Sequence, residues 1–193
     1  MDATPWYQPY TADDISVREC GRSAREIQHV LNECRELRTP YIIITQGMKQ
    51  VTALKRILVP VSRLEEETYK AEICTYLARK SGAHIILLQA KDYGSRARIN
   101  VGKIVTHIKA VSERIGSDIS YEVIDARKNS DKVNIEAAER QRDFVADLIL
   151  LTASREYGLD DILFGPQERH VIQRALTPVM LVNPRADLFS LCD

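Results

Sequence analysis

Residues 148–182, which read LILLTASREYGLDDILFGPQERHVIQRALTPVMLV, decide the fold class. An apolar run of strand length is followed by a polar loop that contains glycine. A helical pattern then starts at Gly165-Pro166, and a second apolar run ends the stretch at 179–182. Strand, loop, helix and strand in this order are typical of a parallel α/β sheet. Ligands of such sheets bind beyond the carboxyl ends of the strands, so we expect function in the loop after the first run.

The same alternation precedes this stretch. Apolar or alternating runs predict strands at residues 56–61, 84–88 and 119–124, and apolar side chains at three- and four-residue steps predict helices at 62–82, 101–116 and 133–145. Connections between parallel strands are right-handed. From residue 56 onward, the chain therefore predicts an α/β fold with a five-stranded parallel sheet and helices on both faces.

The helix after the first of these strands has an acidic start. Ser62 and Glu65 have the spacing of a capping box, in which the hydroxyl accepts from a backbone N–H and the glutamate reaches back. Glu65, Glu66 and Glu67 then fall in the first turn, where the helix dipole favours negative charge. We expect a solvated helix start here rather than a metal site.

The N-terminal residues 1–54 form an extension to the domain at 55–193. We expect an extended arm at 1–20, an amphipathic helix at 22–38 and a strand at 41–45. Three consecutive isoleucines make both faces of this strand apolar, so it needs cover on both sides and partners for its backbone groups. It is expected to join a sheet, either that of its own domain or that of a second subunit.

The composition excludes several classes of protein. The formal net charge of zero argues against a nucleic-acid binder, which usually has a basic excess. No apolar run approaches the roughly 20 residues needed to cross a bilayer. The first residues, MDATPWYQPYTADD, lack the basic and apolar regions of a signal peptide. We therefore expect a cytoplasmic protein with no nucleic-acid or membrane partner.

Side chains that could bind a metal or perform catalysis are scattered. The four cysteines and the four histidines show no metal-ligand spacing, so no metal site is predicted. Ser154 lacks the frame of a nucleophile elbow, and Asp160-Asp161 is interpreted as a capping or solvated pair. No catalytic residue is predicted, and the protein is expected not to be an enzyme.

From about residue 55 to residue 185 the chain resembles the universal stress protein family. The resemblance rests on ILVPV at 57–61, the aliphatic strand at 147–151, Gly158-Leu159 ahead of Gly165, and PVMLV at 178–182. It implies the architecture of the adenine nucleotide alpha hydrolases, with strand order 3-2-1-4-5. It also implies homodimers that pair through the last strand, made of Pro178, Val179, Met180, Leu181 and Val182.

Many members of this family bind ATP in a loop of the form Gly, two residues, Gly, nine residues, Gly and Ser or Thr. Its backbone amides and a helix N-terminus hold the phosphates. In this chain the four positions are Thr152, Arg155, Gly165 and Pro166, so Gly165 alone matches. The family's aspartate at the end of the first strand is replaced by Ser62. If a nucleotide binds, the resemblance places it on Pro60, Val61, Ser62, Gln89, Ala126, Thr152, Arg155, Gly165, Pro166 and Gln167.

Two functions follow from the resemblance. The leading hypothesis is a non-enzymatic homodimer that acts in stress response or regulation through an unidentified protein partner, with no cofactor. The alternative is a sensor that binds ATP or AMP through a modified phosphate site; a weak nucleotide hydrolase comes third. Residues 22–47 are also either the remnant of a first tandem copy, with Thr45 equivalent to Thr152, or a helix and strand of no special relation.

Overall fold

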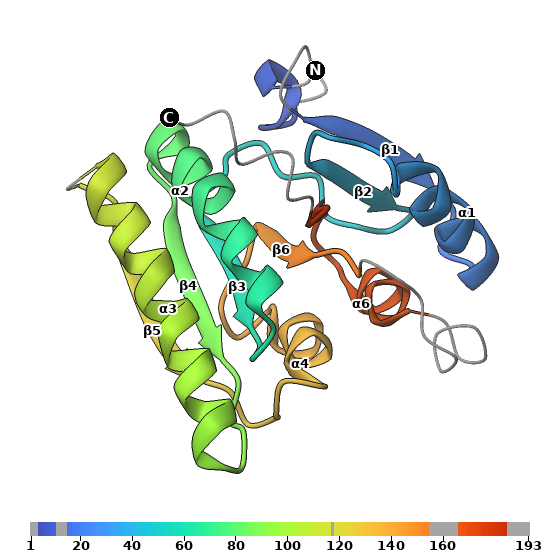
Figure 1. Cartoon of the computed structure of the whole chain (residues 1–193). Helices are drawn as coiled ribbons and strands as arrows, with labels where there is room; N and C mark the ends of the chain where they lie inside the picture. Colours follow the sequence, from blue (N-terminus) through green and yellow to red (C-terminus); the bar gives the residue numbers. More distant parts are fainter. Residues whose placement is uncertain (1–3, 11–14, 117, 155–165, 185–193) are drawn as a thin grey trace.

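The computed structural model describes residues 4–10, 15–116, 118–154 and 166–184 (Figure 1). Seven strands form one sheet in the order β1-β2-β7-β6-β3-β4-β5. Neighbouring strands are parallel except for β2 and β7, which are antiparallel. The strands are β1 (Ser16–Cys20), β2 (Tyr41–Thr45), β3 (Arg56–Val61), β4 (His84–Gln89), β5 (Tyr121–Asp125), β6 (Leu148–Thr152) and β7 (Val179–Val182).

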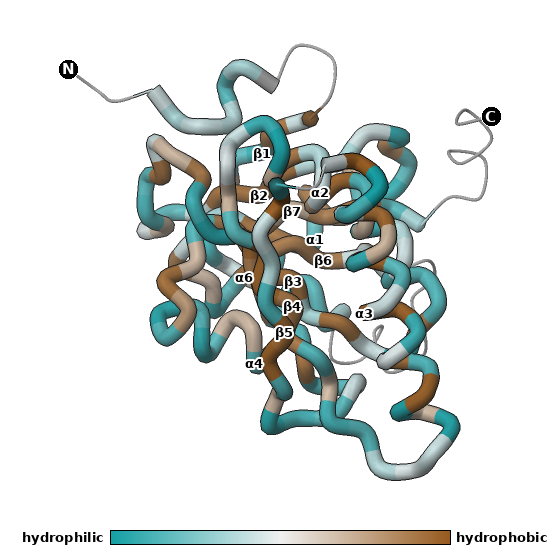
Figure 2. Tube along the Cα trace, turned by 90° about the vertical axis from the view of Figure 1, so that its left-hand side faces the viewer, coloured by the Kyte–Doolittle hydropathy of each residue, from teal (hydrophilic) through white to brown (hydrophobic). Residues whose placement is uncertain are grey.

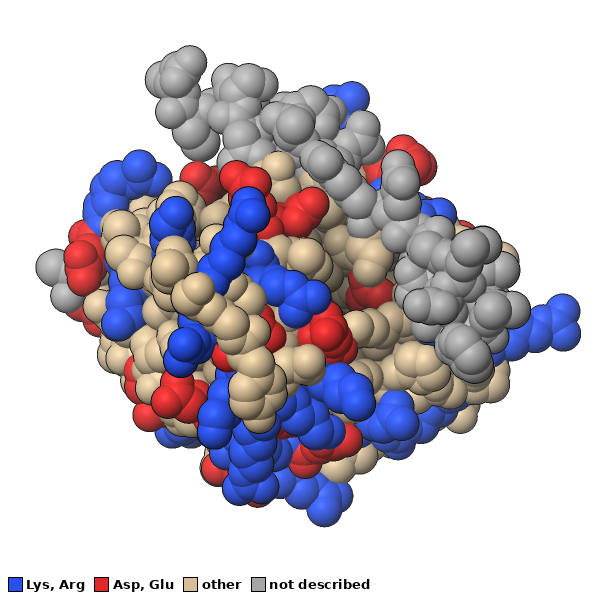
Figure 3. Space-filling view, turned by 60° about the horizontal axis from the view of Figure 1, so that its bottom comes forward, with Lys and Arg blue, Asp and Glu red and all other residues tan. Residues whose placement is uncertain are grey.

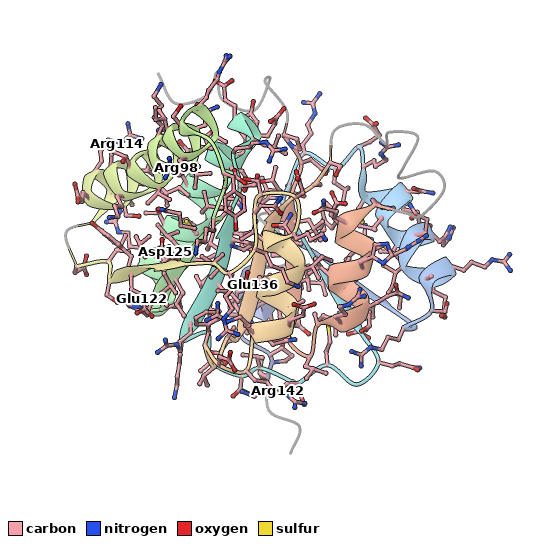
Figure 4. The ribbon with its side chains drawn as sticks, turned by 90° about the horizontal axis from the view of Figure 1, so that it is seen from below. Arg98, Arg114, Glu122, Asp125, Glu136 and Arg142 are labelled. Carbon is pink, nitrogen blue, oxygen red and sulfur yellow. The ribbon has the colours of Figure 1, made fainter. Side chains whose placement is uncertain are left out.

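Helices cover both faces of this sheet. Helices α2 and α3 pack against each other on one face, while α4, α6 and α1 lie side by side on the other, as the view from below shows (Figure 4). The helices are α1 (Ala24–Cys34), α2 (Lys70–Ser81), α3 (Ser95–Ile115), α4 (Val133–Arg140) and α6 (Gln167–Arg174), with short 3-10 turns η1 (Gln8–Tyr10) and η2 (Glu65–Tyr69).

The core lies along the central strands. Ile57, Leu58 and Val59 of β3 and all four residues of β7 are buried. Figure 2 shows the hydrophobic segments gathered at the strands and the hydrophilic ones outside them. Apolar side chains on both faces are expected for strands that are covered by helices on both sides.

The predicted strand order is confirmed within the α/β domain. Strands β5, β4, β3, β6 and β7 are all parallel and lie in the predicted order 3-2-1-4-5. The prediction of a five-stranded parallel sheet is wrong, because β1 and β2 extend it to seven strands and make it mixed. The arm predicted at 1–20 is also wrong in part, since residues 16–20 form β1.

The N-terminal strand finds its cover in its own chain. Tyr41, Ile42 and Ile43 of β2 are almost fully buried, and the strand lies between β1 and β7. Strand β7 therefore has neighbours on both edges, β2 and β6. A homodimer that pairs through Pro178–Val182 cannot form while β2 occupies that edge.

Candidate functional site

The strand order reverses direction between β3 and β6, where the connections lead to opposite faces of the sheet. The helix after β3 is α2, and the helix after β6 is α6. The ladder between these two strands contains only the pairs Ile57–Leu148 and Leu58–Ile149. Pro60 has no N–H to donate, and its carbonyl accepts from the ammonium group of Lys70 instead. The strands therefore part at their carboxyl ends, which is where open α/β sheets bind ligands.

A cavity of about 330 Å³ opens at this point. Its walls come from the segment after β3, the loop before α4, the end of β6 and the start of α6. Figure 3 is turned so that the lower side of Figure 1 comes forward, and on that face acidic and basic side chains are interspersed. The lining residues are Ser62, Arg63, Leu64, Glu66, Glu67, Ser130, Asp131, Asn134, Thr152, Ala153, Ser154, Gln167 and Glu168.

A series of buried polar side chains at the carboxyl end of β3 forms the floor of the cavity. The Ser62 hydroxyl donates to Glu67 Oε1 at 2.7 Å, and the other carboxylate oxygen of Glu67 forms an ion pair with Lys70. The Lys70 side chain is fully buried and reaches this carboxylate from the first turn of α2. A buried charge is tolerated when it is paired and hydrogen-bonded, so these side chains fix the end of β3.

These contacts correct the predicted capping box. Ser62 gives its hydroxyl proton to Glu67, and η2 begins after Leu64 with no side-chain cap. Glu67 is buried rather than solvated, because Lys70 neutralises it. The Ser62–Glu67 pair is also no activated nucleophile, since a carboxylate that is paired with an ammonium group is a poor general base.

The rim of the cavity is held by Arg63 and the loop before α4. The Arg63 guanidinium lies 2.8 Å from Asp131 and 3.7 Å from the buried Asp92. The Arg63 backbone N–H donates to the Ser130 hydroxyl at 2.8 Å. On the opposite side, the Gln167 side-chain amide donates to the Asp131 carbonyl at 2.8 Å. The segment after β3, the loop before α4 and helix α6 are thus tied together around the cavity.

Glu136, labelled on α4 in Figure 4, holds the start of that loop. Its carboxylate accepts from the backbone N–H groups of Arg127 and Lys128 at 2.7–3.0 Å and from the Arg140 guanidinium. Burial by itself raises the pKa of this carboxyl, but the backbone donors and Arg140 outweigh it and lower the pKa below the ordinary value. An anchored carboxylate at this point keeps Ser130 and Asp131 at the rim.

Glu168 is a carboxylate in the first turn of α6, and it is buried at the end of β6. One oxygen accepts from the backbone N–H of Ser154, in the segment that follows β6. The side chain is 4% exposed, and its other oxygen is buried without a hydrogen bond to any described residue. The helix dipole favours negative charge at this position. The first turn of α6 therefore places a negative charge of the chain itself against Ser154, just after β6.

The structure brings together part of the predicted nucleotide site. Ser62, Thr152 and Gln167 line the cavity. Pro60 and Val61 belong to β3, whose end forms the floor, and Pro166 is the N-cap of α6.

Two predicted residues lie outside this lining. Gln89 ends β4, and its carbonyl accepts from the N–H of Ala126 after β5; neither residue lines the cavity, and their part in nucleotide binding stays a prediction. Arg155 and Gly165 lie outside the described residues, as does the pair Asp160-Asp161.

Sequence reasoning missed the buried acidic residues of the site. Glu168 follows Gln167 in a helical pattern whose other buried positions, Val171 and Ile172, are apolar. An acidic residue three positions before one apolar core residue and four before another was the signal that could have found it.

Metal and membrane sites are not found in the described part of the chain. No group of three or more His, Cys, Asp or Glu side chains among those residues is placed to hold a metal ion. No described helix is long and apolar enough to cross a bilayer. Burial raises the pKa of the Cys74 thiol to about 12, which keeps this buried cysteine protonated and unreactive.

A comparison with protein families shows which family this chain belongs to. The sequence pattern of the Universal stress protein family matches residues 53–183, which is more than half of the chain. The chain belongs to the universal stress protein family. The matched region starts just before β3 and ends just after β7, so it includes every strand of the predicted domain.

Solved structures of universal stress proteins share the fold. One, from Archaeoglobus fulgidus DSM 4304, is 15% identical with a TM-score of 0.62, and the match covers 93% of this chain and 64% of that one. This universal stress protein therefore spans less than two thirds of that archaeal structure. Because 93% of the present chain is matched, the match includes most of residues 1–54. A second, in complex with cAMP, is 17% identical with a TM-score of 0.52, covering 69% of this chain and 99% of that one. No curated protein matches significantly in sequence.

Proposed function

We propose that this universal stress protein acts without catalysis and without ATP, through contacts with a protein partner in stress response or regulation. The proposal rests on the hydrogen bond from the Ser154 N–H to the Glu168 carboxylate. In the family, the loop after the fourth domain strand and the helix that follows hold phosphates. Here the corresponding backbone donor is already bound to a carboxylate of the same chain.

The charges around the cavity support the proposal that the protein acts without ATP. A triphosphate in the cavity would approach Glu168 and Glu66, neither of which has a basic partner among the described residues. Like charges at close range in a partly buried site repel strongly. Arg63 is the basic residue of the described lining, and it is already engaged with Asp131 and Asp92. Binding ATP would require both the Glu168 contact and this ion pair to break.

A second candidate is a sensor for an adenine nucleotide bound through a modified phosphate site. It is favoured by the position of the cavity at the point where the strand order reverses, and by the solved universal stress protein that is in complex with cAMP. A nucleotide with one phosphate carries less negative charge than ATP. It could bind with its base and ribose near Ser62 and Thr152 and its phosphate away from Glu168.

Calorimetric titration with ATP and magnesium, AMP and cAMP tests both candidates. We expect no saturable heat with ATP for the wild type. A loop variant that restores the family pattern, Thr152→Gly, Arg155→Gly and Pro166→Ser, should still fail to bind ATP. The same variant with Glu168→Ala added should bind it, because the Ser154 N–H is then released.

Four results would overturn the leading proposal. Micromolar binding of ATP by the wild type would show that Glu168 is no obstacle, and so would binding by the loop variant that retains Glu168. Saturable binding of AMP or cAMP without ATP would establish the second candidate. Steady release of phosphate from ATP would make the protein a hydrolase.

A further inference from the structure

The cavity at the ends of β3 and β6 is acidic. Its described lining contains four carboxylates against one guanidinium, and the carboxylates are Glu66, Glu67, Asp131 and Glu168. Two of them are compensated, since Glu67 pairs with Lys70 and Asp131 pairs with Arg63. Glu66 and Glu168 have no basic partner among the described residues. The cavity therefore retains negative charge that the described part of the chain does not neutralise.

The cavity also contains hydrogen-bond acceptors that lack donors. In the part of the chain that the structure describes, the second carboxylate oxygen of Glu168 and the side-chain oxygen of Asn134 are both buried without a hydrogen bond. Buried polar atoms in native proteins nearly always have a partner, and a buried carboxylate oxygen that lacks one is costly. Glu168 is more than nine-tenths buried and lines the cavity, so a donor bound there next to this carboxylate would supply the partner that it lacks.

We propose that this cavity binds the primary ammonium group of a small organic amine. The inference rests on the proposed function, because it requires that the same cavity does not hold ATP. An ammonium group has three donors and no acceptor. Its positive charge would complement the negative charges of Glu66 and Glu168, which have no basic partner among the described residues. A volume of about 330 Å³ falls within the range of small-molecule sites.

The chemistry of the lining favours an amine over a metal ion. Divalent cations require several oxygen ligands arranged around one point. Among the described residues, no group of three or more acidic, His or Cys side chains has that arrangement. An ammonium group needs only separate acceptors within hydrogen-bond reach, such as one oxygen each from Glu168, Asn134 and a water molecule.

The test is a titration of the full chain with 1,4-diaminobutane, followed by calorimetry and by the NMR signal of the Ser154 amide, which donates to Glu168. We expect saturable binding that shifts this signal. Glu168→Gln should weaken binding roughly tenfold or more, because a charge-assisted hydrogen bond is lost. Glu66→Gln, at a less buried position, should also weaken it and serves as the second variant if Glu168→Gln fails to fold.

Two controls separate the site from general attraction between charges. Glu65→Gln removes an exposed carboxylate next to Glu66 that does not line this cavity, and it should leave binding unchanged. Tetramethylammonium has the charge but no N–H donor, and it should bind much more weakly than the diamine. Equal binding of tetramethylammonium, or wild-type affinity in both cavity variants, would overturn the inference.

The outcomes also separate this inference from the proposed function. If neither ATP nor the diamine binds, the amine site is wrong and the proposal of an ATP-independent protein stands. If ATP binds at micromolar concentration, the proposed function is wrong and the amine site fails with it.

Discussion

Ile42 of β2 lies opposite Met180 of β7 at the centre of the antiparallel pair. On one side Tyr41 faces Leu181, and on the other Ile43 faces Val179. Both strands follow a Thr-Pro dipeptide, so Ile42 and Met180 occupy equivalent positions, two residues after each proline. The register is therefore that of a local two-fold axis, like the contact between two identical subunits, but within one chain.

The surroundings of the pair repeat this symmetry. The Pro40 carbonyl accepts from Ser16 at the start of β1, and the Pro178 carbonyl accepts from Ile149 of β6. Helices α1 and α6 have buried residues at the same spacing, with Ile27 in α1 where Glu168 stands in α6. The unit β1-α1-β2 thus has the same order of elements and the same spacing of buried helix residues as β6-α6-β7. The hypothesis of a remnant copy stays a prediction.

The two units also bind each other's helix ends. The Arg22 guanidinium donates to the carbonyls of Gln173 and Ala175 at 3.0 Å, at the end of α6. The Asn183 amide donates to the carbonyls of Cys34 and Leu37 at 2.9 Å, at the end of α1. Helix ends leave carbonyls without partners, so these contacts join the N-terminal segment to the domain.

We expect Ile42→Ala to destabilise the whole chain by roughly 2–5 kcal/mol, the usual cost of truncating a fully buried isoleucine. Urea unfolding followed by circular dichroism measures the change. Ile99→Ala is the matched control, because Ile99 is 55% exposed on α3 and its truncation should cost well under about 1 kcal/mol. Equal, small effects of the two substitutions would mean that β2 is dispensable.

Limited proteolysis should leave residues 16–54 attached to the domain. Val51 and Leu54 are buried in the connection after β2, and the Lys49 N–H donates to the Leu176 carbonyl at 2.7 Å. A protease needs a locally unfolded substrate, and these contacts oppose unfolding. Early cleavage between residues 46 and 53 that releases a domain of unchanged stability would contradict this prediction.

Val145→Asn should stabilise the protein by about 1 kcal/mol. Val145 is 65% exposed and has a φ of 50°, in the left-handed region that costs an ordinary residue roughly 1–2 kcal/mol and that asparagine tolerates better. Val145→Ala is the control, since its Cβ keeps most of the strain. Thermal unfolding of the two variants checks this, and an asparagine variant no more stable than the alanine variant would refute it.

The acid limb of the stability curve should depend on Glu136. Its pKa is lowered in the folded protein, so the unfolded chain binds more protons in acid. The stabilisation is complete above the ordinary carboxyl pKa of 4.5 and is lost as the pH falls through the lower folded pKa. Glu136→Gln should flatten the curve in this range when urea unfolding is measured against pH.

The control for that measurement is Glu139→Gln. Glu139 lies on the same helix as Glu136, and its carboxylate is more exposed and is paired with Lys128. Its acid limb should follow that of the wild type. If both variants have the same pH dependence, the anchor at Arg127 and Lys128 contributes nothing measurable.

The patterns in the sequence were sufficient for the five strands of the α/β domain, and the family resemblance implied their order. Runs such as RILVPV at 56–61 are apolar on both faces, and a strand of that kind has to lie inside a parallel sheet with helices on each side. The reversal of strand order then located the cavity, because the carboxyl ends of β3 and β6 meet there. The family resemblance named Ser62, Thr152 and Gln167 as candidate site residues, and all three line this cavity.

Only the tertiary structure decided where β2 lies and what fills the site. Ile42, Ile43 and Ile44 require a neighbour, but their pattern is the same whether that neighbour is a second subunit or β7 of the same chain. Similarity between two stretches of the sequence made Thr45 the equivalent of Thr152. The two-fold register of β2 and β7 instead makes Thr39-Pro40 the equivalent of Thr177-Pro178.

The charges of the site were equally beyond local reasoning. Glu67 appears in a run of three glutamates, and Lys70, which neutralises it, is three residues away on a helix face that only packing turns inward. Glu168 becomes a ligand of the Ser154 N–H because α6 folds back onto the end of β6. Periodicity determines which residues share a face of an element, but the partner of each buried charge is fixed by the contacts between elements.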